Sequence, residues 1–105
     1  MDTLEISQKK KRVRQLQKEL AGVGPVMRGS VVIIGTRNKQ PYFSLNKGGR
    51  TRLIYLGRKR EPQAREYSEN YQRLLAIVEE MTTLNMELLR HGAESAALPE
   101  GKSSG

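Results

Sequence analysis

The sequence predicts an α+β fold in which an N-terminal basic helix, a three-stranded antiparallel meander and a long C-terminal helix follow one another. Three observations predict this order. Residues 4–20 carry apolar side chains at near-helical spacing, three short runs of strand-forming residues lie within 26–60, and residues 63–90 contain neither glycine nor proline. With 105 residues, the chain is long enough for one domain with a modest core.

The first segment, residues 1–25, is predicted to be a basic amphipathic helix followed by a connector. Its apolar stripe runs from Leu4 to Leu20 and is interrupted by a cluster of lysines and arginines. Gly22 and Pro25 mark the end of this helix, because glycine favours C-terminal caps and proline cannot continue a helix.

Residues 26–60 are predicted to form the three-stranded sheet. The expected strands are residues 31–34, 42–45 and 51–56, which are rich in β-branched, aromatic and other apolar side chains. Gly48 and Gly49 lie between the second and third strands, and glycine tolerates the positive φ angles of a tight hairpin turn. We therefore expect a two-residue turn at this point.

A two-residue turn also predicts the pairing of these strands, with Tyr42 opposite Tyr55 and Leu45 opposite Arg52. One face of the sheet is then apolar and is expected to pack on a helix; it carries Phe43, Leu45, Ile54 and Leu56, with Arg52 near its rim. The other face is polar and includes two aromatic rings; it carries Tyr42, Ser44, Asn46, Thr51, Leu53 and Tyr55.

Residues 61–91 are predicted to form one long helix, with Pro62 in its first turn and Gly92 as its C-terminal cap. Side chains recur along it at alternating steps of four and three, which is typical of a coiled-coil seam. This seam comprises Tyr67, Tyr71, Leu74, Val78, Met81, Asn85 and Leu88. All of these residues except Tyr67 form the predicted partner or dimer interface. The partner is either the N-terminal helix, folded back as a hairpin, or the same helix of a second chain. Residues 92–105 are predicted to be a disordered tail.

Several classes of function are not expected for this sequence. The chain has no cysteine and one histidine, His91, so a structural zinc site is not expected. No set of side chains forms a recognisable catalytic or cofactor-binding motif, and we expect a protein that is not an enzyme and holds no cofactor. No apolar run suggests a secretory signal or a membrane span, so the expected location is the cytoplasm.

The distribution of charge predicts a polyanionic partner. The net charge is +8, with 15 Lys/Arg against 3 Asp/Glu in residues 1–60 and 4 against 8 in residues 61–105. Such separation favours nucleic acid, with duplex DNA preferred over RNA and, for a DNA-binding protein, location at the nucleoid. The predicted nucleic-acid-binding residues are Lys9, Lys10, Lys11, Arg12, Arg14, Arg28, Arg37, Lys39, Tyr42, Lys47, Arg50, Arg52, Tyr55, Arg58, Lys59 and Arg60.

Other interpretations of the same residues remain open. Tyr42 and Tyr55 could stack on unpaired RNA bases, or could form a cross-strand pair that only stabilises the hairpin. The lysine run near the N-terminus could be a solvated helix end. A different class of function is an interaction subunit that binds a larger enzyme of a mobile element or phage through the apolar stripe of residues 67–89.

Four segments resemble an uncharacterised family of small bacterial proteins linked with transposons and other mobile elements. They are Met-Arg-Gly-Ser at 27–30, Pro-Tyr-Phe-Ser-Leu at 41–45, Gly-Gly-Arg-Thr-Arg at 48–52, and the run within 69–89. The link with mobile elements agrees with nucleic-acid binding but supplies no assigned activity. The function predicted for this chain is that of a DNA-binding accessory or regulatory protein of a bacterial mobile element or phage. Family members often carry clustered cysteines between the first two strands, and this chain has none there. The order of three strands and a helix is also similar to the N-terminal DNA-binding domains of phage-type integrases.

Overall fold

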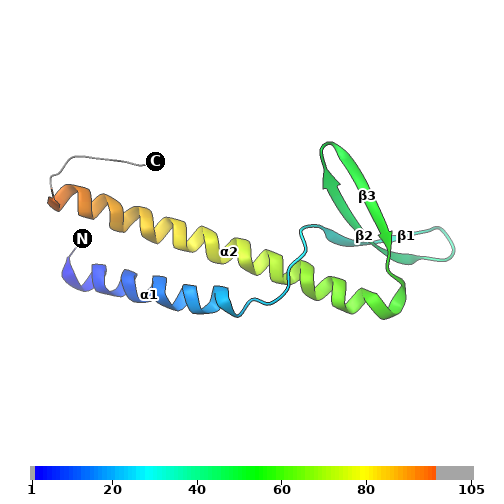
Figure 1. The fold of residues 1–105 in the computed structure, drawn as a ribbon, viewed down its shortest axis with the longest axis horizontal. Coiled ribbons are helices and arrows are strands. Elements are labelled where there is room, and N and C mark those ends of the chain that lie inside the picture. The colour runs from blue at the N-terminus through cyan, green and yellow to red at the C-terminus, as the bar shows by residue number, and fades with distance from the viewer. Residues whose placement is uncertain (1, 97–105) are drawn as a thin grey trace. The chain divides into compact units, whose positions relative to one another are not determined.

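A computed structural model, which describes residues 2–96 and the side chains of residues 2–92, confirms the α+β arrangement. Figure 1 shows the elements in chain order, α1 (Thr3–Ala21), β1 (Ser30–Ile34), β2 (Gln40–Lys47), β3 (Arg50–Tyr55) and α2 (Gly57–Ala96). Among these residues, no helix has both the length and the apolar character needed to cross a membrane.

The chain forms two compact units, whereas the sequence predicted one domain. The sheet unit is Gly22–Leu75, and the hairpin unit consists of Met1–Ala21 together with Ala76–Gly105. The reason is the length of α2: its 40 residues extend about 60 Å, which is far more than strands of five to eight residues can cover. The first half of α2 therefore belongs to one unit and the second half to the other.

The sheet has the strand order β1-β2-β3, with both neighbouring pairs antiparallel. The predicted register of the second hairpin is confirmed, since Tyr42 pairs with Tyr55 and Leu45 with Arg52. Gly48 and Gly49 have φ angles of 60° and 76°, as a type I′ turn requires at both central positions. Glycine adopts these angles without steric cost, and the turn thereby fixes which side chains share a face.

The core of the sheet unit lies between the sheet and the first half of α2. Phe43, Leu56 and Ala64 form its buried cluster, with exposed fractions of 5%, 7% and 4%. Half-buried Met27 and Val31 pack against this cluster, as does Leu45. Ala64 has the smallest side chain of the three and lets the backbone of α2 lie close to the phenyl ring of Phe43.

The segment before β1 is held to α2 by hydrogen bonds. The backbone N–H of Met27 donates to the carbonyl oxygen of Tyr67 at 3.1 Å. The Asn70 side-chain amide donates to the carbonyl oxygen of Pro25 at 2.8 Å. These bonds satisfy polar groups of an irregular segment, and they fix the point from which the sheet begins.

Gly29 occupies a position at the start of β1 where a side chain would not fit. Its φ is 141°, and an added Cβ would lie 2.6 Å from the Ser44 carbonyl oxygen and 2.7 Å from the Phe43 ring. Its own carbonyl oxygen accepts a hydrogen bond from the Ser68 hydroxyl at 2.7 Å. The close approach allows the first strand to pack directly over the core.

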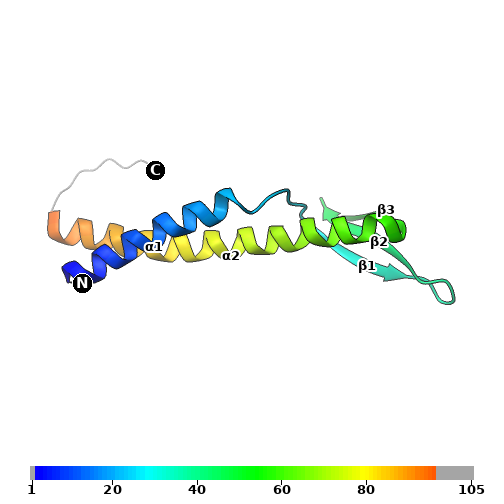
Figure 2. The ribbon, with the colours of Figure 1, turned by 90° about the horizontal axis from the view of Figure 1, so that it is seen from below.

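In the hairpin unit, α1 runs antiparallel beside the second half of α2, as both views in Figures 1 and 2 show. Leu16 of α1 is 1% exposed and Ile77 of α2 is 6% exposed. Met81, Leu84 and Leu88 lie on the same stripe of α2 as Ile77 and are half-buried. Of the two partners proposed from the sequence, the structure contains the folded-back N-terminal helix.

Two positions of the predicted seam lie outside the stripe of α2 that is buried in the hairpin unit. Val78 is 44% exposed and Asn85 is also exposed, because the buried stripe runs through their neighbours Ile77 and Leu84. Consecutive helical residues point about 100° apart, so an error of one residue moves a side chain off the buried face. Tyr71 and Leu74 are half-buried within the sheet unit, while Met81 and Leu88 are half-buried within the hairpin unit.

The ends of α2 also differ from the prediction of 61–91. The helix begins at Gly57, directly after Leu56, whose N–H donates to the Pro41 carbonyl oxygen. It ends at Ala96, so Gly92 is not its cap. The Arg60 guanidinium donates to the Leu56 carbonyl oxygen at 2.8 Å. Of the predicted tail at 92–105, residues 92–96 are helical and residues 97–105 lie outside the described residues.

Two ion pairs link the helices of the hairpin unit. Arg12 donates from Nε to Glu80 Oε2 at 2.8 Å and from Nη2 to Glu80 Oε1 at 2.9 Å, and Lys9 Nζ lies 2.9 Å from Glu87 Oε1. The hydrogen bonds from Arg12 lower the pKa of the Glu80 carboxyl group, and the same bonds raise the pKa of Arg12.

The Arg12–Glu80 pair predicts a small dependence of stability on pH. Because the pKa of Glu80 is lower in the folded chain, the pair stabilises the hairpin unit above the unfolded pKa of about 4.3, and this contribution is lost as the pH falls through the lowered folded value. We expect Glu80→Gln to melt below the wild type at neutral pH and together with it at about pH 2.5.

Thermal unfolding followed by far-UV circular dichroism measures this difference. Glu79→Gln is the matched control, since Glu79 is exposed and makes no ion pair with a side chain of residues 2–92. A difference between wild type and Glu80→Gln that persists at low pH would show that the effect does not come from the ion pair.

Candidate nucleic-acid interface

The net charge of the protein lies entirely on the sheet unit. Residues 22–75 contain eleven Lys/Arg and three Asp/Glu, and the two segments of the hairpin unit together contain eight of each. A division of the chain at residue 60 does not show that the sheet unit carries the net charge. The excess cations of residues 1–21 are balanced by the excess carboxylates of residues 76–105. The sheet unit alone therefore has the charge of +8.

The cations are concentrated in residues 22–60, where there are nine Lys/Arg and no Asp/Glu. All nine are exposed. They are Arg28 before β1, Arg37 and Lys39 in the loop after β1, Lys47 and Arg50 at the glycine turn, Arg52 on β3, and Arg58, Lys59 and Arg60 at the start of α2. The sheet unit thus carries positive charge at both hairpin ends and at the helix start.

Most of these cations form no ion pair with the side chains that the structure describes. Arg28 and Arg60 each donate to a backbone carbonyl oxygen, the former to Asn46 at 2.9 Å. The other seven form no ion pair with any side chain of residues 2–92. Lysine and arginine side chains in this state are available to bind phosphate groups.

The predicted binding residues on α1 fall into two groups. Lys9 and Arg12 take part in the ion pairs to α2, and Arg12 also lies 3.4 Å from Glu19. The side chains of Lys10, Lys11 and Arg14 make no ion pair within residues 2–92. Part of the basic cluster therefore stabilises the helical hairpin, and the rest is free for a ligand.

The face of the sheet that points away from α2 is held by its own side-chain contacts. The rings of Tyr42 and Tyr55 pack edge to face, with centroids 5.5 Å apart and planes inclined by 70°. The Tyr55 hydroxyl donates to Gln40 Oε1 at 3.1 Å, and the Thr51 hydroxyl donates to Asn46 Oδ1 at 2.6 Å. The two tyrosines thus form the cross-strand pair that the sequence analysis left open, while their contact with nucleic acid stays a prediction.

The apolar face of the sheet is less covered than the sequence predicted. Phe43 and Leu56 are buried there, but Ile54 is 60% exposed, and every residue of β3 is exposed. The structure has a single helix over this face, and the helix and the segment at Met27 cover β2 and leave β3 open. Alternation along a strand predicts which face a side chain occupies, and it does not predict how far a helix extends over that face.

The described side chains contain no group of three His, Cys, Asp or Glu residues placed to hold a metal ion. No protein family model, curated protein or solved structure matches this chain. The resemblance to the mobile-element-linked bacterial family stays a prediction.

Proposed function

We propose that this protein binds nucleic acid, preferentially duplex DNA, through the sheet unit. The observation that carries the proposal is the concentration of the whole net charge of +8 on residues 22–75, with no carboxylate within residues 22–60. Repulsion among these cations lowers the stability of the folded unit, and bound phosphate groups would reduce that repulsion. The proposed biological role is that of an accessory or regulatory protein of a bacterial mobile element or phage.

The seven unpaired cations of residues 22–60 set the strength of the electrostatic contribution. Each cation that neutralises a DNA phosphate releases condensed counterions. With all seven cations engaged, a plot of the logarithm of the binding constant against the logarithm of the salt concentration has a slope of about −6. This contribution carries no sequence information. Specific contacts with base edges would come from the polar face that contains Asn46 and Thr51.

The tyrosine pair favours duplex DNA over single-stranded RNA. A ring that stacks on an unpaired base needs a free face, and Tyr42 is half-buried with its ring packed edge to face with Tyr55, so the pair presents less open ring surface than two free tyrosines would. Cations at both hairpin ends are instead suited to phosphates on either side of a groove. Lys10, Lys11 and Arg14 of α1 are a second set of available cations in a unit without net charge.

Removal of three sheet-unit cations is expected to weaken binding and flatten its salt dependence. In the triple variant Lys47→Gln, Arg50→Gln and Arg58→Gln, we expect the salt slope to decrease by roughly 2 to 3 units. The measurement is fluorescence anisotropy with labelled duplex DNA and with RNA, from about 50 to about 300 mM salt.

The matched control removes three cations of the hairpin unit, in the variant Lys18→Gln, Arg90→Gln and Lys102→Gln. Both triple variants lower the net charge equally, yet only the sheet-unit variant is expected to show this decrease in slope. Equal losses in the two variants would show that overall charge, and not the sheet unit, causes the binding. No binding of either polymer at low salt would contradict the proposal.

A second candidate function is protein interaction through the uncovered side of α2. Within the hairpin unit, Val78, Met86 and Leu89 are 44%, 57% and 73% exposed, and Asn85 lies beside them. Exposed apolar side chains grouped on one side of a helix are typical of a binding surface. A homodimer and a larger mobile-element enzyme are the two partners that the sequence suggests for this side.

A further inference from the structure

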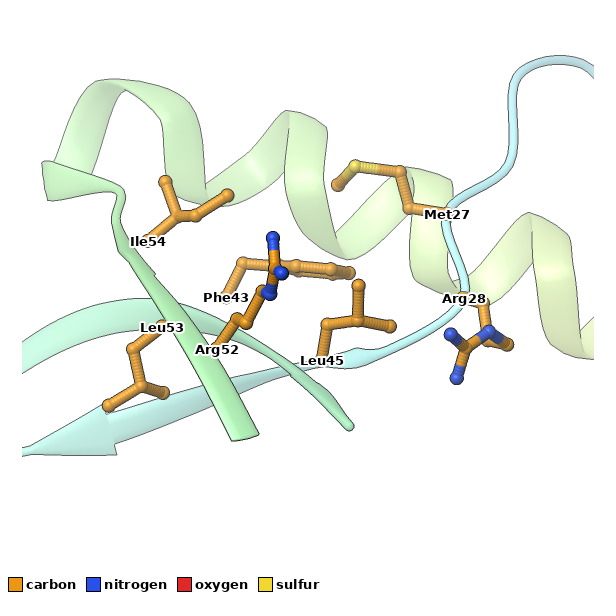
Figure 3. A pocket seen from close by; sticks show the side chains of 7 residues that line it. All are labelled: Met27, Arg28, Phe43, Leu45, Arg52, Leu53 and Ile54. Carbon is orange, nitrogen blue, oxygen red and sulfur yellow. The ribbon is translucent and has the colours of Figure 1, made fainter. Parts of the chain in front are cut away.

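A groove of about 740 Å³ lies on the α2-facing side of the sheet, where α2 leaves β3 uncovered. Its apolar lining includes Met27, Phe43, Leu45 and Ile54, and it is flanked by Arg28 and Arg52. Figure 3 shows Phe43, Leu45, Arg52 and Ile54 on the same side of the sheet, below the segment that carries Met27. The groove therefore combines apolar side chains with two cationic ones.

Beside the groove, β3 has a free backbone edge. It is the last strand of the sheet, and hydrogen-bonded and non-hydrogen-bonded pairs alternate along an antiparallel ladder. The Leu56 N–H donates to the Pro41 carbonyl oxygen at 3.0 Å, so these two residues are a hydrogen-bonded pair. Every second residue before Leu56, which includes Ile54 and Arg52, therefore also bonds to β2. The N–H and C=O groups of Thr51, Leu53 and Tyr55 consequently point away from β2, and no backbone hydrogen bond within residues 2–96 engages them.

The charge around the groove identifies the kind of partner. Arg28 is held in place by its bond to the Asn46 carbonyl oxygen, and Arg52 makes no ion pair with the described side chains. No described carboxylate pairs with either arginine, so both can bind the carboxylates of another molecule. A phosphate backbone would leave the apolar lining without a partner, whereas a polypeptide supplies apolar side chains, carboxylates and backbone amides together.

We propose that β3 and this groove bind an extended acidic segment of a partner protein, which adds to the sheet as its fourth strand. In the partner segment, the residue opposite Ile54 has an apolar side chain that enters the groove. The partner residue two positions further along lies opposite Arg52 and has a carboxylate. A second carboxylate, opposite Arg50, continues the same face. The partner's intervening residues exchange backbone hydrogen bonds with the free edge of β3. Arg50 and Arg52 also belong to the proposed nucleic-acid interface, but binding of the acidic segment does not depend on nucleic acid.

The probe that tests the proposal is the blocked peptide Thr-Leu-Thr-Glu-Thr-Glu, added to the full-length protein. Backbone amide hydrogen exchange, followed by NMR, is expected to slow at Thr51, Leu53 and Tyr55 and to stay unchanged at Arg52 and Ile54, which already bond to β2. An N-methyl group on the middle threonine of the peptide is expected to abolish this protection. The same group on the first glutamate, whose N–H points away from β3, is expected to preserve it.

Substitutions in the protein test the charge and the apolar anchor separately. Arg52→Glu is expected to weaken peptide binding about tenfold, and Lys18→Glu, the same charge change in the hairpin unit, is expected to leave it unchanged. Ile54→Thr keeps a β-branched residue at an exposed position and is expected to weaken binding as well. Near-UV circular dichroism of the tyrosines verifies that each variant is folded.

Three results would overturn the proposal. They are unchanged exchange at Thr51, Leu53 and Tyr55, equal binding of a peptide with lysine in place of glutamate, and equal affinity of wild type and Arg52→Glu for the acidic peptide. If duplex DNA protects these amides and the peptide does not, the groove belongs to the nucleic-acid interface. Because the peptide assay contains no nucleic acid, its failure is distinguishable from failure of the DNA titration.

Discussion

Replacement of Phe43 by alanine is expected to unfold the sheet unit. Phe43 is 5% exposed and contributes the largest side chain of the buried cluster that it forms with Leu56 and Ala64. Truncation of a buried phenylalanine costs about 3 to 5 kcal/mol, because apolar contacts are lost and a cavity remains. A core of this size supplies about 3 to 5 kcal/mol in total, so the free energy of unfolding of the sheet unit falls to near zero.

The tyrosines give a signal specific to this unit. All four lie within residues 22–75 and the chain has no tryptophan, so near-UV circular dichroism and intrinsic fluorescence report the sheet unit alone. Leu53→Ala is the matched control, since Leu53 is 49% exposed on the opposite face of the same sheet, and its truncation is expected to cost about 1 kcal/mol or less. If Phe43→Ala and Leu53→Ala unfold at the same denaturant concentration, the assignment of the core to Phe43 is incorrect.

The second large effect is expected for Leu16→Ala in the hairpin unit. Leu16 is 1% exposed and is the largest fully buried side chain among the described residues. Its truncation is expected to cost about 2 to 5 kcal/mol. Helix α1 has 19 residues, and isolated helices of this length are marginal in water, so loss of the Leu16 contact is expected to release α1 into a largely unfolded segment.

Far-UV circular dichroism measures this loss, since α1 holds about one third of the helical residues in the structure. The tyrosine signal of the sheet unit is expected to change little. Gln17→Ala is the control: Gln17 is exposed on the same turn, and alanine favours helix, so its helical signal is expected to equal or exceed that of wild type. An undiminished helical signal in Leu16→Ala would mean that α1 does not depend on its packing against α2.

The parts of the fold that follow from local sequence were predictable. Two adjacent glycines specify a type I′ turn, and that turn determined every cross-strand pair from Tyr42 to Asn46. Helix α1 and the basic character of the sheet were likewise apparent from short stretches of sequence. In these cases the physical cause lies within a few residues of its effect.

The parts that depend on contacts between distant segments were not predictable. Helix α2 carries apolar side chains on more than one side, and only the position of α1 decides that Ile77 is buried and Val78 exposed. Ile54 alternates correctly with its neighbours, yet its exposure depends on where α2 and the Met27 segment end over the sheet. Within the candidate site, Lys9 and Arg12 could not be separated from Lys10 and Lys11, because their partners Glu87 and Glu80 are far away in sequence.

The unequal division of charge also means that ionic strength acts with opposite sign on the folding of the two units. In the sheet unit, eleven cations face three carboxylates, so dissolved ions reduce self-repulsion and stabilise the folded form. In the hairpin unit, the same ions weaken the attraction of Arg12 for Glu80 and of Lys9 for Glu87. A polyanion that binds only the folded sheet would be a stabilising ligand for that unit, and binding of the proposed nucleic acid would then be coupled to folding in one equilibrium.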